Sequence, residues 1–140
     1  MPFEELKYHG NLNKENEENG ILVFFFNDKK FFGFLELLPY TKSQIKQFNL
    51  LNDIHEISDV FIFEEFRGRG LCKKMIEVLI RDFNYPLKIT VENDNIPAIK
   101  CYQKYFKQIN NKRNVDWLIK NVWKLKNIKD REFITFIHIK

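Results

Sequence analysis

The chain has 140 residues, the length of one domain, and its 44% hydrophobic and 30% charged residues are enough to bury a core. Its longest apolar run, Ile21 to Phe26, is far too short to span a membrane, and its polar start is typical of neither a signal peptide nor a transit peptide. The formal net charge of +4 is compatible with a polyanionic ligand, but the dispersed basic residues do not indicate a nucleic-acid-binding stripe.

Two cysteines, Cys72 and Cys101, are too few for a disulfide framework or a zinc site. We therefore expect no metal site and a reducing compartment, which implies a cytoplasmic location. No repeat interrupts the chain, and we expect a single domain over residues 1–140.

Strand signals dominate the first half of the chain. Two aromatic and branched runs flank the polar residues 27–30, which predicts a β-hairpin. The other elements expected here are a short strand over 3–8, a polar loop over 11–20, a short helix within 44–51 and a strand over 54–63.

The second half alternates helices and strands. Apolar residues at helical spacing predict a helix over 71–83, which Pro86 stops. A second helix over 96–106 is capped by Asn95 or Asp94, with Pro97 in its first turn. A strand over 87–91, a third helix capped by Asn114 and a closing strand over 133–139 complete a mixed α/β (α+β) fold.

A glycine turn joins the strand over 54–63 to the first long helix. Gly68 and Gly70 let the backbone turn sharply and approach a ligand closely. The following helix N-terminus offers free N–H groups and a positive dipole end, which suit a pyrophosphate, and Arg67, Arg69 and Lys73 add positive charge. The spacing is neither a Walker A loop nor the dinucleotide fingerprint, and a plain strand-to-helix turn explains it about equally well.

A second stretch places three notable residues on one helix face. Asn95 opens the predicted helix, Ala98 follows three residues later, and Tyr102 comes four residues after that. Seven residues are two helical turns, so Asn95 and Tyr102 share a face on which the small Ala98 leaves room for a ligand. A helix cap and a core tyrosine would explain the same residues without any ligand.

Together the two stretches resemble the GCN5-related N-acetyltransferase (GNAT) superfamily. The family signature Arg/Gln-x-x-Gly-x-Gly/Ala reads here Arg67-x-x-Gly70-x-Cys72. The signature Asn-x-x-Ala-x-x-x-Tyr-x-x-Gly-Phe reads here Asn95-x-x-Ala98-x-x-x-Tyr102-x-x-Tyr105-Phe106. Cys72 replaces a small residue and Tyr105 replaces a glycine. The resemblance covers about residues 54–106 and implies a central, mostly antiparallel sheet flanked by helices.

The resemblance also implies acetyl-coenzyme A as cosubstrate and an amine as acceptor. The strand residues would pair with the pantetheine arm, the turn would hold the pyrophosphate, Asn95 would lie near the thiol end, and Tyr102 would be the general acid. The residues expected to bind the coenzyme are Phe61, Ile62, Phe63, Arg67, Gly68, Arg69, Gly70, Leu71, Cys72, Lys73 and Asn95.

The chemistry of the transfer asks for three groups. The thiol of the leaving group has a pKa of about 8.5 and a phenol one of about 10, so Tyr102 is able to deliver a proton to the departing thiolate if the site is partly dry. A backbone N–H from the strand over 60–63 is the expected oxyanion donor. An acceptor amine such as lysine, with a pKa of about 10.4, requires a base to remove its proton.

Glu56 is the candidate for that base, with Asp59, His55 and His138 as alternatives. Glu56 and Asp59 face opposite sides of an ideal strand, so at most one points into the site unless a bulge intervenes. Some family members carry a Glu on the next strand, where this chain has Thr90. A structural role explains each candidate at least as well.

The family usually places a strand and two helices before its central hairpin. Only about twenty residues precede Ile21 here, so the N-terminal region is shortened. Trp117 and Trp123 belong either to the acceptor wall or to the core.

The expected activity is acetyl transfer to a primary amine of a small molecule or protein, and the alternative is a catalytically inactive coenzyme-A-binding module. The sequence leaves a homodimer as one possibility, and nucleic acid is the least expected partner.

Overall fold

The computed structural model describes residues 3–9 and 19–139 and contains a seven-stranded sheet in the order β1-β2-β3-β4-β5-β7-β6. All neighbouring strands are antiparallel except β4 and β5, which are parallel. The expected mixed fold with a mostly antiparallel sheet is confirmed. The strands are β1 (Phe3–His9), β2 (Asn19–Asn27), β3 (Lys30–Pro39), β4 (His55–Ile62), β5 (Leu87–Glu92), β6 (Lys107–Ile109) and β7 (Phe133–His138).

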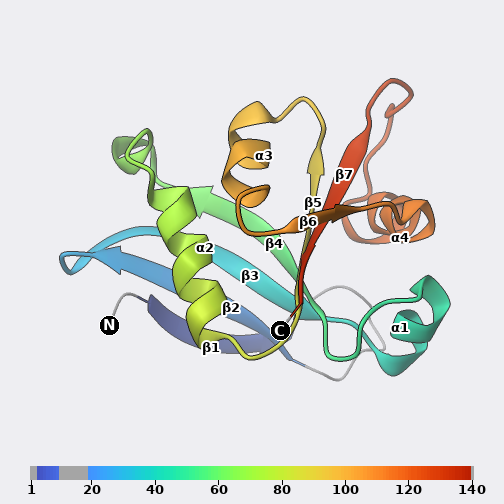
Figure 1. Ribbon diagram of the computed structural model, residues 1–140, viewed down its shortest axis with the longest axis horizontal. Helices are drawn as coiled ribbons and strands as arrows, with labels where there is room; N and C mark the ends of the chain where they lie inside the picture. Colours follow the sequence, from blue (N-terminus) through green and yellow to red (C-terminus); the bar gives the residue numbers. More distant parts are fainter. Residues whose placement is uncertain (1–2, 10–18, 140) are drawn as a thin grey trace.

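Helices cover both faces of this sheet. They are α1 (Lys42–Phe48), α2 (Leu71–Asp82), α3 (Ile96–Tyr102) and α4 (Lys112–Trp117), which continues into the π-helical turn η2 (Leu118–Val122). Figure 1 shows α2 crossing strands β1 to β4 and α3 standing beside β5. Side chains of α2 and α3 build the larger core, and residues around η2 build a smaller core that includes Leu38, Ile54 and Leu118.

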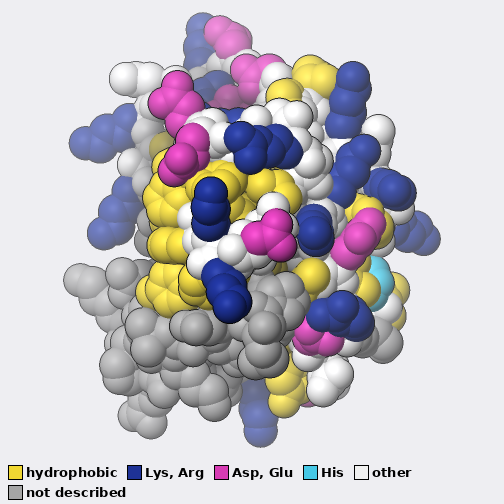
Figure 2. All heavy atoms as spheres, turned by 90° about the vertical axis from the view of Figure 1, so that its left-hand side faces the viewer, with side chains coloured by type: hydrophobic (Ala, Val, Ile, Leu, Met, Phe, Trp, Pro, Cys, Tyr) yellow, Lys and Arg dark blue, Asp and Glu magenta, His cyan; other side chains and the backbone are white. Residues whose placement is uncertain are grey.

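The predicted β2–β3 hairpin is confirmed. Its tip residues Asp28 and Lys29 both have positive φ, 50° and 65°, as a two-residue hairpin turn requires. Alternate residues such as Val23 and Leu35 are buried, because they face the larger core. Seen from the hairpin side, apolar side chains gather at the surface beside lysines and arginines (Figure 2). Phe61 on β4 belongs to an aromatic cluster near this end and remains 40% exposed.

Helix α2 agrees closely with the sequence prediction. Its buried residues Leu71, Met75, Val78 and Leu79 lie on one face, and the helix ends at Asp82, shortly before the proline. Because these side chains fill the core, the first turn of the helix is held near the C-terminal end of β4.

Two boundaries in the second half of the chain differ from the prediction. Helix α3 ends at Tyr102 rather than at residue 106, and the chain turns there to form the short strand β6. Helix α4 is capped by Asn111, because Asn114 is fully buried and donates a hydrogen bond to Tyr40. The predicted loop over 11–20 lies largely outside the described residues. In the part of the chain that is described, no helix is long and apolar enough to cross a membrane.

Candidate active site

The site begins where two parallel strands part. Strands β4 and β5 pair at only three positions, and the last pair joins Ile57 to Ile89. Beyond it β4 is irregular, since its register with β3 shifts and Asp59 has a φ of 50°. A pocket of about 910 Å³ lies beside the diverging ends of the two strands.

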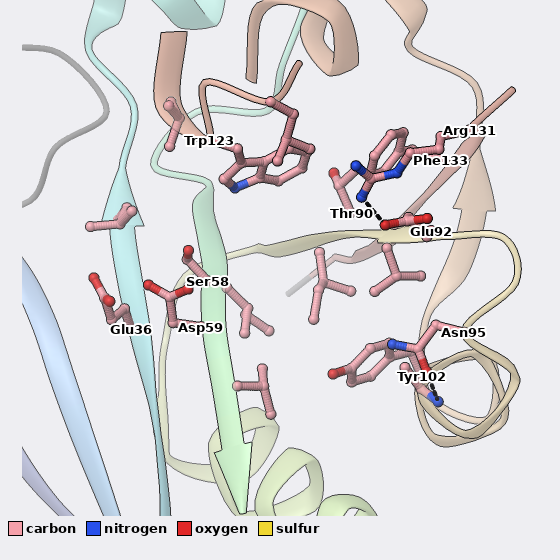
Figure 3. A pocket seen from close by; sticks show the side chains of 18 of the residues that line it. Glu36, Ser58, Asp59, Thr90, Glu92, Asn95, Tyr102, Trp123, Arg131 and Phe133 are labelled. Carbon is pink, nitrogen blue, oxygen red and sulfur yellow. Dashed lines mark hydrogen bonds and ion pairs between the residues drawn. The ribbon is translucent and has the colours of Figure 1, made fainter. Parts of the chain in front are cut away.

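Three groups of side chains line this pocket. Figure 3 shows Asn95 and Tyr102 of α3 on one side, Glu36 and Asp59 on another, and an aromatic and charged group on the third. The third group comprises Trp123, Arg131 and Phe133. Ser58, Val60, Thr90, Glu92, Asp94 and Ala98 are further lining residues.

The predicted face of α3 is present. Asn95 caps the helix, its Oδ1 accepting a hydrogen bond from the Ala98 N–H at 3.3 Å, and all of Asn95, Ala98 and Tyr102 line the pocket. Tyr102 is only 4% exposed, its ring stacks on Phe106, and its burial raises the pKa of its hydroxyl to about 12. The hydroxyl group points toward the pocket (Figure 3), so Tyr102 presents a protonated donor there at neutral pH.

The glycine turn lies outside the pocket lining, past the end of β4. Gly68 and Gly70 have positive φ values of 77° and 72°, and Gly70 is the N-cap of α2. A Cβ added to either glycine would meet no atom within 4 Å, so backbone conformation rather than space requires glycine here. Arg69 lies over the Phe66 ring at 5.6 Å, and Lys73 is exposed on α2. The turn therefore keeps open space, free helix N–H groups and positive charge, and it fits a pyrophosphate.

The end of β4 offers fewer pairing groups than expected. The Phe63 N–H donates to the Phe32 carbonyl oxygen at 2.9 Å and is used by β3. Arg67 Nε donates to the Ile62 carbonyl oxygen at 2.8 Å, and its guanidinium lies over the Phe61 ring. An added strand along this edge would have to displace Arg67 from Ile62.

A disulfide bond joins Cys72 to Cys101, with a Cα–Cα distance of 6.3 Å. The sequence predicted no disulfide framework and a reducing compartment, but this single bond forms because α2 and α3 pack side by side and bring together residues 29 apart in sequence. The residue that replaces the small amino acid of the first signature is therefore linked to the neighbour of Tyr102. Tyr105, which replaces a glycine, adds a second link by donating a hydrogen bond to Glu77 on α2.

Glu56 lies outside the pocket lining. Its Oε1 accepts hydrogen bonds from the Tyr40 hydroxyl and from Lys88 Nζ, both at 2.6 Å, and the side chain is 2% exposed. Burial lowers the pKa of Lys88, an effect that the charge of Glu56 opposes, and burial together with Glu56 raises the pKa of Tyr40. The other candidate on β4, Asp59, does line the pocket.

The two histidines considered as bases, His55 and His138, also lie away from the pocket lining. His55 Nδ1 is 2.8 Å from the Asp53 carbonyl oxygen and its ring stacks on Tyr85. The ring of His138 packs against Phe106. Asp59 is thus the one of the four predicted base candidates that the fold brings to the pocket.

Lys88 is a residue near the site that was not predicted from the sequence. It lies in the middle of an apolar strand and is fully buried, and its Nζ also donates to Thr90 Oγ1 at 3.0 Å. A lysine and a threonine two residues apart in a buried strand share a face, and that alternation was the available signal.

The pocket lining is acidic although the chain as a whole is basic. It contains Glu36, Asp59, Glu92 and Asp94, against a single arginine, Arg131, which forms an ion pair with Glu92. Among the described residues, no group of three or more His, Cys, Asp or Glu side chains is arranged to hold a metal ion.

Several solved structures share this fold. One is the N-acetyltransferase PseH of Campylobacter jejuni in complex with acetyl coenzyme A, with 15% identity and a TM-score of 0.53 over 86% of this chain and 68% of that chain. A ribosomal-protein-alanine N-acetyltransferase from Brucella melitensis has 13% identity and a TM-score of 0.59, over 86% and 69% of the two chains. A variant of spermidine N-acetyltransferase SpeG from Vibrio cholerae has 15% identity and a TM-score of 0.59, over 90% and 68%.

No curated protein sequence matches the chain. The profile of the acetyltransferase (GNAT) family matches residues 2–107, which include the parting strands, the glycine turn and helix α3. The resemblance seen in the two signatures is therefore confirmed, and the chain belongs to the acetyltransferase (GNAT) family.

Proposed function

We propose that the chain transfers the acetyl group of acetyl-coenzyme A to a primary amine of a small molecule or protein. The observation that carries this proposal is the position of Tyr102. Its buried hydroxyl points into a pocket at the parting of β4 and β5, and Asn95 and Ala98 line the same pocket. A donor held in a partly dry site is what protonation of a departing thiolate needs.

The glycine turn supports acetyl-coenzyme A as the cosubstrate. Its two positive-φ glycines and the N-terminus of α2 suit the pyrophosphate, and Arg69 and Lys73 lie beside it. The edge of β4 past Ile57 runs from the pocket toward that turn. PseH, which shares the fold, was solved with acetyl coenzyme A bound.

Tyr102 is the proposed general acid. With a pKa of about 12 it stays protonated at neutral pH, so it keeps the hydrogen that a general acid must supply. Donation to the sulfur stabilises the negative charge that develops as the carbon–sulfur bond breaks.

Asp59 replaces Glu56 as the proposed base. Glu56 is engaged by Tyr40 and Lys88 in the core, whereas Asp59 lines the pocket, where an incoming ammonium group loses its proton directly or through water. The acidic lining, which also includes Glu36, favours an acceptor that carries positive charge. The structural neighbours include a ribosomal-protein-alanine N-acetyltransferase and a spermidine N-acetyltransferase, so both protein and polyamine acceptors belong in the test.

Two measurements test this function. Calorimetry with acetyl-coenzyme A should show binding without added metal, and a screen of peptides, lysine and polyamines should identify an acceptor that is acetylated. Binding without transfer to any amine would instead favour the inactive coenzyme-A-binding module. Absence of binding at millimolar coenzyme would contradict both functions. The cytoplasmic location remains a prediction of the sequence.

A further inference from the structure

A buried polar network lies directly beneath the point where β4 and β5 part. We define it as Tyr40, Glu56, Lys88, Thr90 and Asn114, none of which is more than 9% exposed. A buried ion pair such as Glu56–Lys88 is costly to desolvate and is weak evidence for stability. Charged groups buried beside a pocket are more typical of a functional site. The proposed general acid and base leave this network without a role.

The hydrogen bonds of the network fix the position of the Lys88 ammonium group. Nζ donates to Glu56 Oε1 at 2.6 Å and to Thr90 Oγ1 at 3.0 Å, and it lies 5.9 Å from the centre of the Tyr40 ring. Glu56 is itself held by the Tyr40 hydroxyl, which in turn accepts a hydrogen bond from Asn114 at 3.3 Å. These bonds hold the Lys88 ammonium group next to Thr90.

Thr90 connects this network to the pocket. A threonine hydroxyl has one hydrogen to donate and two lone pairs, and Lys88 occupies one lone pair. Thr90 lines the pocket, and none of the hydrogen bonds among the described residues uses its own O–H as donor. An ammonium group bonded to the oxygen polarises that O–H and makes it a stronger donor.

The position of Thr90 along β5 suggests which substrate atom it meets. It is the first residue of β5 past the last pair with β4, Ile57–Ile89, and so it lies at the apex of the opening. The turn suited to the pyrophosphate, around Gly70, lies at the open end of β4. A coenzyme arm threaded from that turn places its acetyl group, the far end of the arm, nearest the apex.

We propose that the Thr90 hydroxyl donates a hydrogen bond to the carbonyl oxygen of the acetyl group, and that Lys88, held by Glu56 and Tyr40, is the positioning residue that aims it. When the amine nitrogen forms its bond to the carbonyl carbon, the π electron pair moves onto this oxygen. Thr90 keeps its proton and stabilises the negative charge, next to a backbone N–H of β4. This role rests on the proposed function.

Infrared spectroscopy of bound acetyl-coenzyme A, labelled with carbon-13 at the carbonyl, tests the hydrogen bond without any acceptor. A hydrogen bond to a carbonyl lowers its stretching frequency. We expect the frequency to be lower on the unmodified chain than on the Thr90→Val variant, which keeps the shape and removes the hydroxyl. The Thr90→Ser variant should restore the low frequency.

Thr135→Val is the matched control. Thr135 pairs with Thr90 across β5 and β7 and is also buried. It lies outside the pocket lining, and its Oγ1 makes no hydrogen bond with the described residues. Its replacement should leave the carbonyl frequency unchanged. With an identified acceptor, Thr90→Val should also lower kcat roughly 10²-fold with little change in KM, as loss of one oxyanion donor does.

The positioning role of Lys88 has its own test. The double variant Glu56→Gln, Lys88→Met removes both charges together, so that neither is left buried and unpaired. We expect it to shift the carbonyl frequency toward the Thr90→Val value although Thr90 is present. An unchanged frequency in this folded double variant would overturn the role of Lys88.

The remaining outcomes separate the two proposals. An unchanged frequency in Thr90→Val, with normal coenzyme binding, would overturn the role of Thr90 and leave the acetyltransferase function standing. A chain that binds no acetyl-coenzyme A would overturn the proposed function and the role of Thr90 with it.

Discussion

Cys72 in the first turn of α2 is disulfide-bonded to Cys101 in α3, one residue before Tyr102. The bond closes a loop with a sequence separation of 29, for which chain entropy predicts a stabilisation of about 3 to 4 kcal/mol. We expect reductant to lower the free energy of unfolding by that amount, as measured with urea.

The double variant Cys72→Ala, Cys101→Ala is the control, and its stability should not respond to reductant. Alkylation and mass spectrometry without reductant should find neither thiol free in the purified protein. Two modified cysteines would contradict the bond. The same measurement on protein alkylated inside cells also tests the cytoplasmic location, because a reducing compartment favours free thiols.

Replacing Tyr102 by Phe tests the general acid. The ring and its stacking on Phe106 are kept, so coenzyme affinity should stay within a few-fold, while kcat falls by roughly 10²–10⁴. Thioesters with better leaving groups should be less affected, because they need less protonation. Tyr105→Phe is the control, since this hydroxyl bonds to Glu77 outside the pocket lining. Near-normal turnover by Tyr102→Phe would refute the assignment.

The pH dependence of kcat/KM follows from the buried phenol. A general acid acts in its protonated form, which is lost as the pH rises through its pKa, and burial raises the pKa of Tyr102 to about 12. We expect kcat/KM to rise with pH as the acceptor amine loses its proton, without an alkaline descent below about pH 11. A descending limb near pH 10, the usual range of a phenol, would show that the hydroxyl is not held as the structure has it.

Gly70→Ala tests the glycine turn. Gly70 has a φ of 72° with open space around its Cβ position, so the expected loss is the backbone cost of about 1–2 kcal/mol, together with weaker coenzyme binding. Asn49→Ala is matched to it, because Asn49 has a φ of 54° at the end of α1. It should lose stability without losing coenzyme affinity. Equal affinity of both variants for the coenzyme would show that the turn does not belong to the coenzyme site.

The acidic lining predicts a preference for acceptors with more than one positive charge. We expect Glu36→Gln and Asp59→Asn each to raise KM for a diamine more than for a monoamine, and the effect to weaken at high salt. Asp116→Asn, an exposed carboxylate on α4, should change neither value. Equal changes for both amines would show that charge does not select the acceptor.

Most elements of the fold could be predicted because they carry local signals. Polar residues between two aromatic runs predicted the hairpin, and apolar residues at helical spacing predicted α2. Strand β6 has only three residues, too few for a recognisable hydrophobic pattern, and it forms by pairing with β7. The end of α3 was missed for the same reason, since Tyr105 turns toward Glu77 on another helix.

One helix face of the candidate site could be predicted from a motif, and the roles of its residues remain proposals. Asn95, Ala98 and Tyr102 share a helix face and meet at the pocket as expected. Strand alternation left Glu56 and Asp59 as alternatives, of which only Asp59 lines the pocket, because Glu56 pairs with Lys88, a residue 32 positions away. Contacts between residues so distant in sequence leave no trace in a single chain.

Strands β4 and β5, in the middle of the sheet, are joined by only three residue pairs, fewer than the neighbouring pairs of strands on either side. Strands β1 to β4 and strands β5 to β7 are joined there by these backbone pairs, and α2 and α3 share one core with both sets of strands. The bond between Cys72 and Cys101 links α2 to α3 and limits how far these helices can separate. A coenzyme arm lying along β4 would add backbone hydrogen bonds beyond the third pair of β4 and β5. The bound cosubstrate would then stabilise the fold for the duration of one turnover.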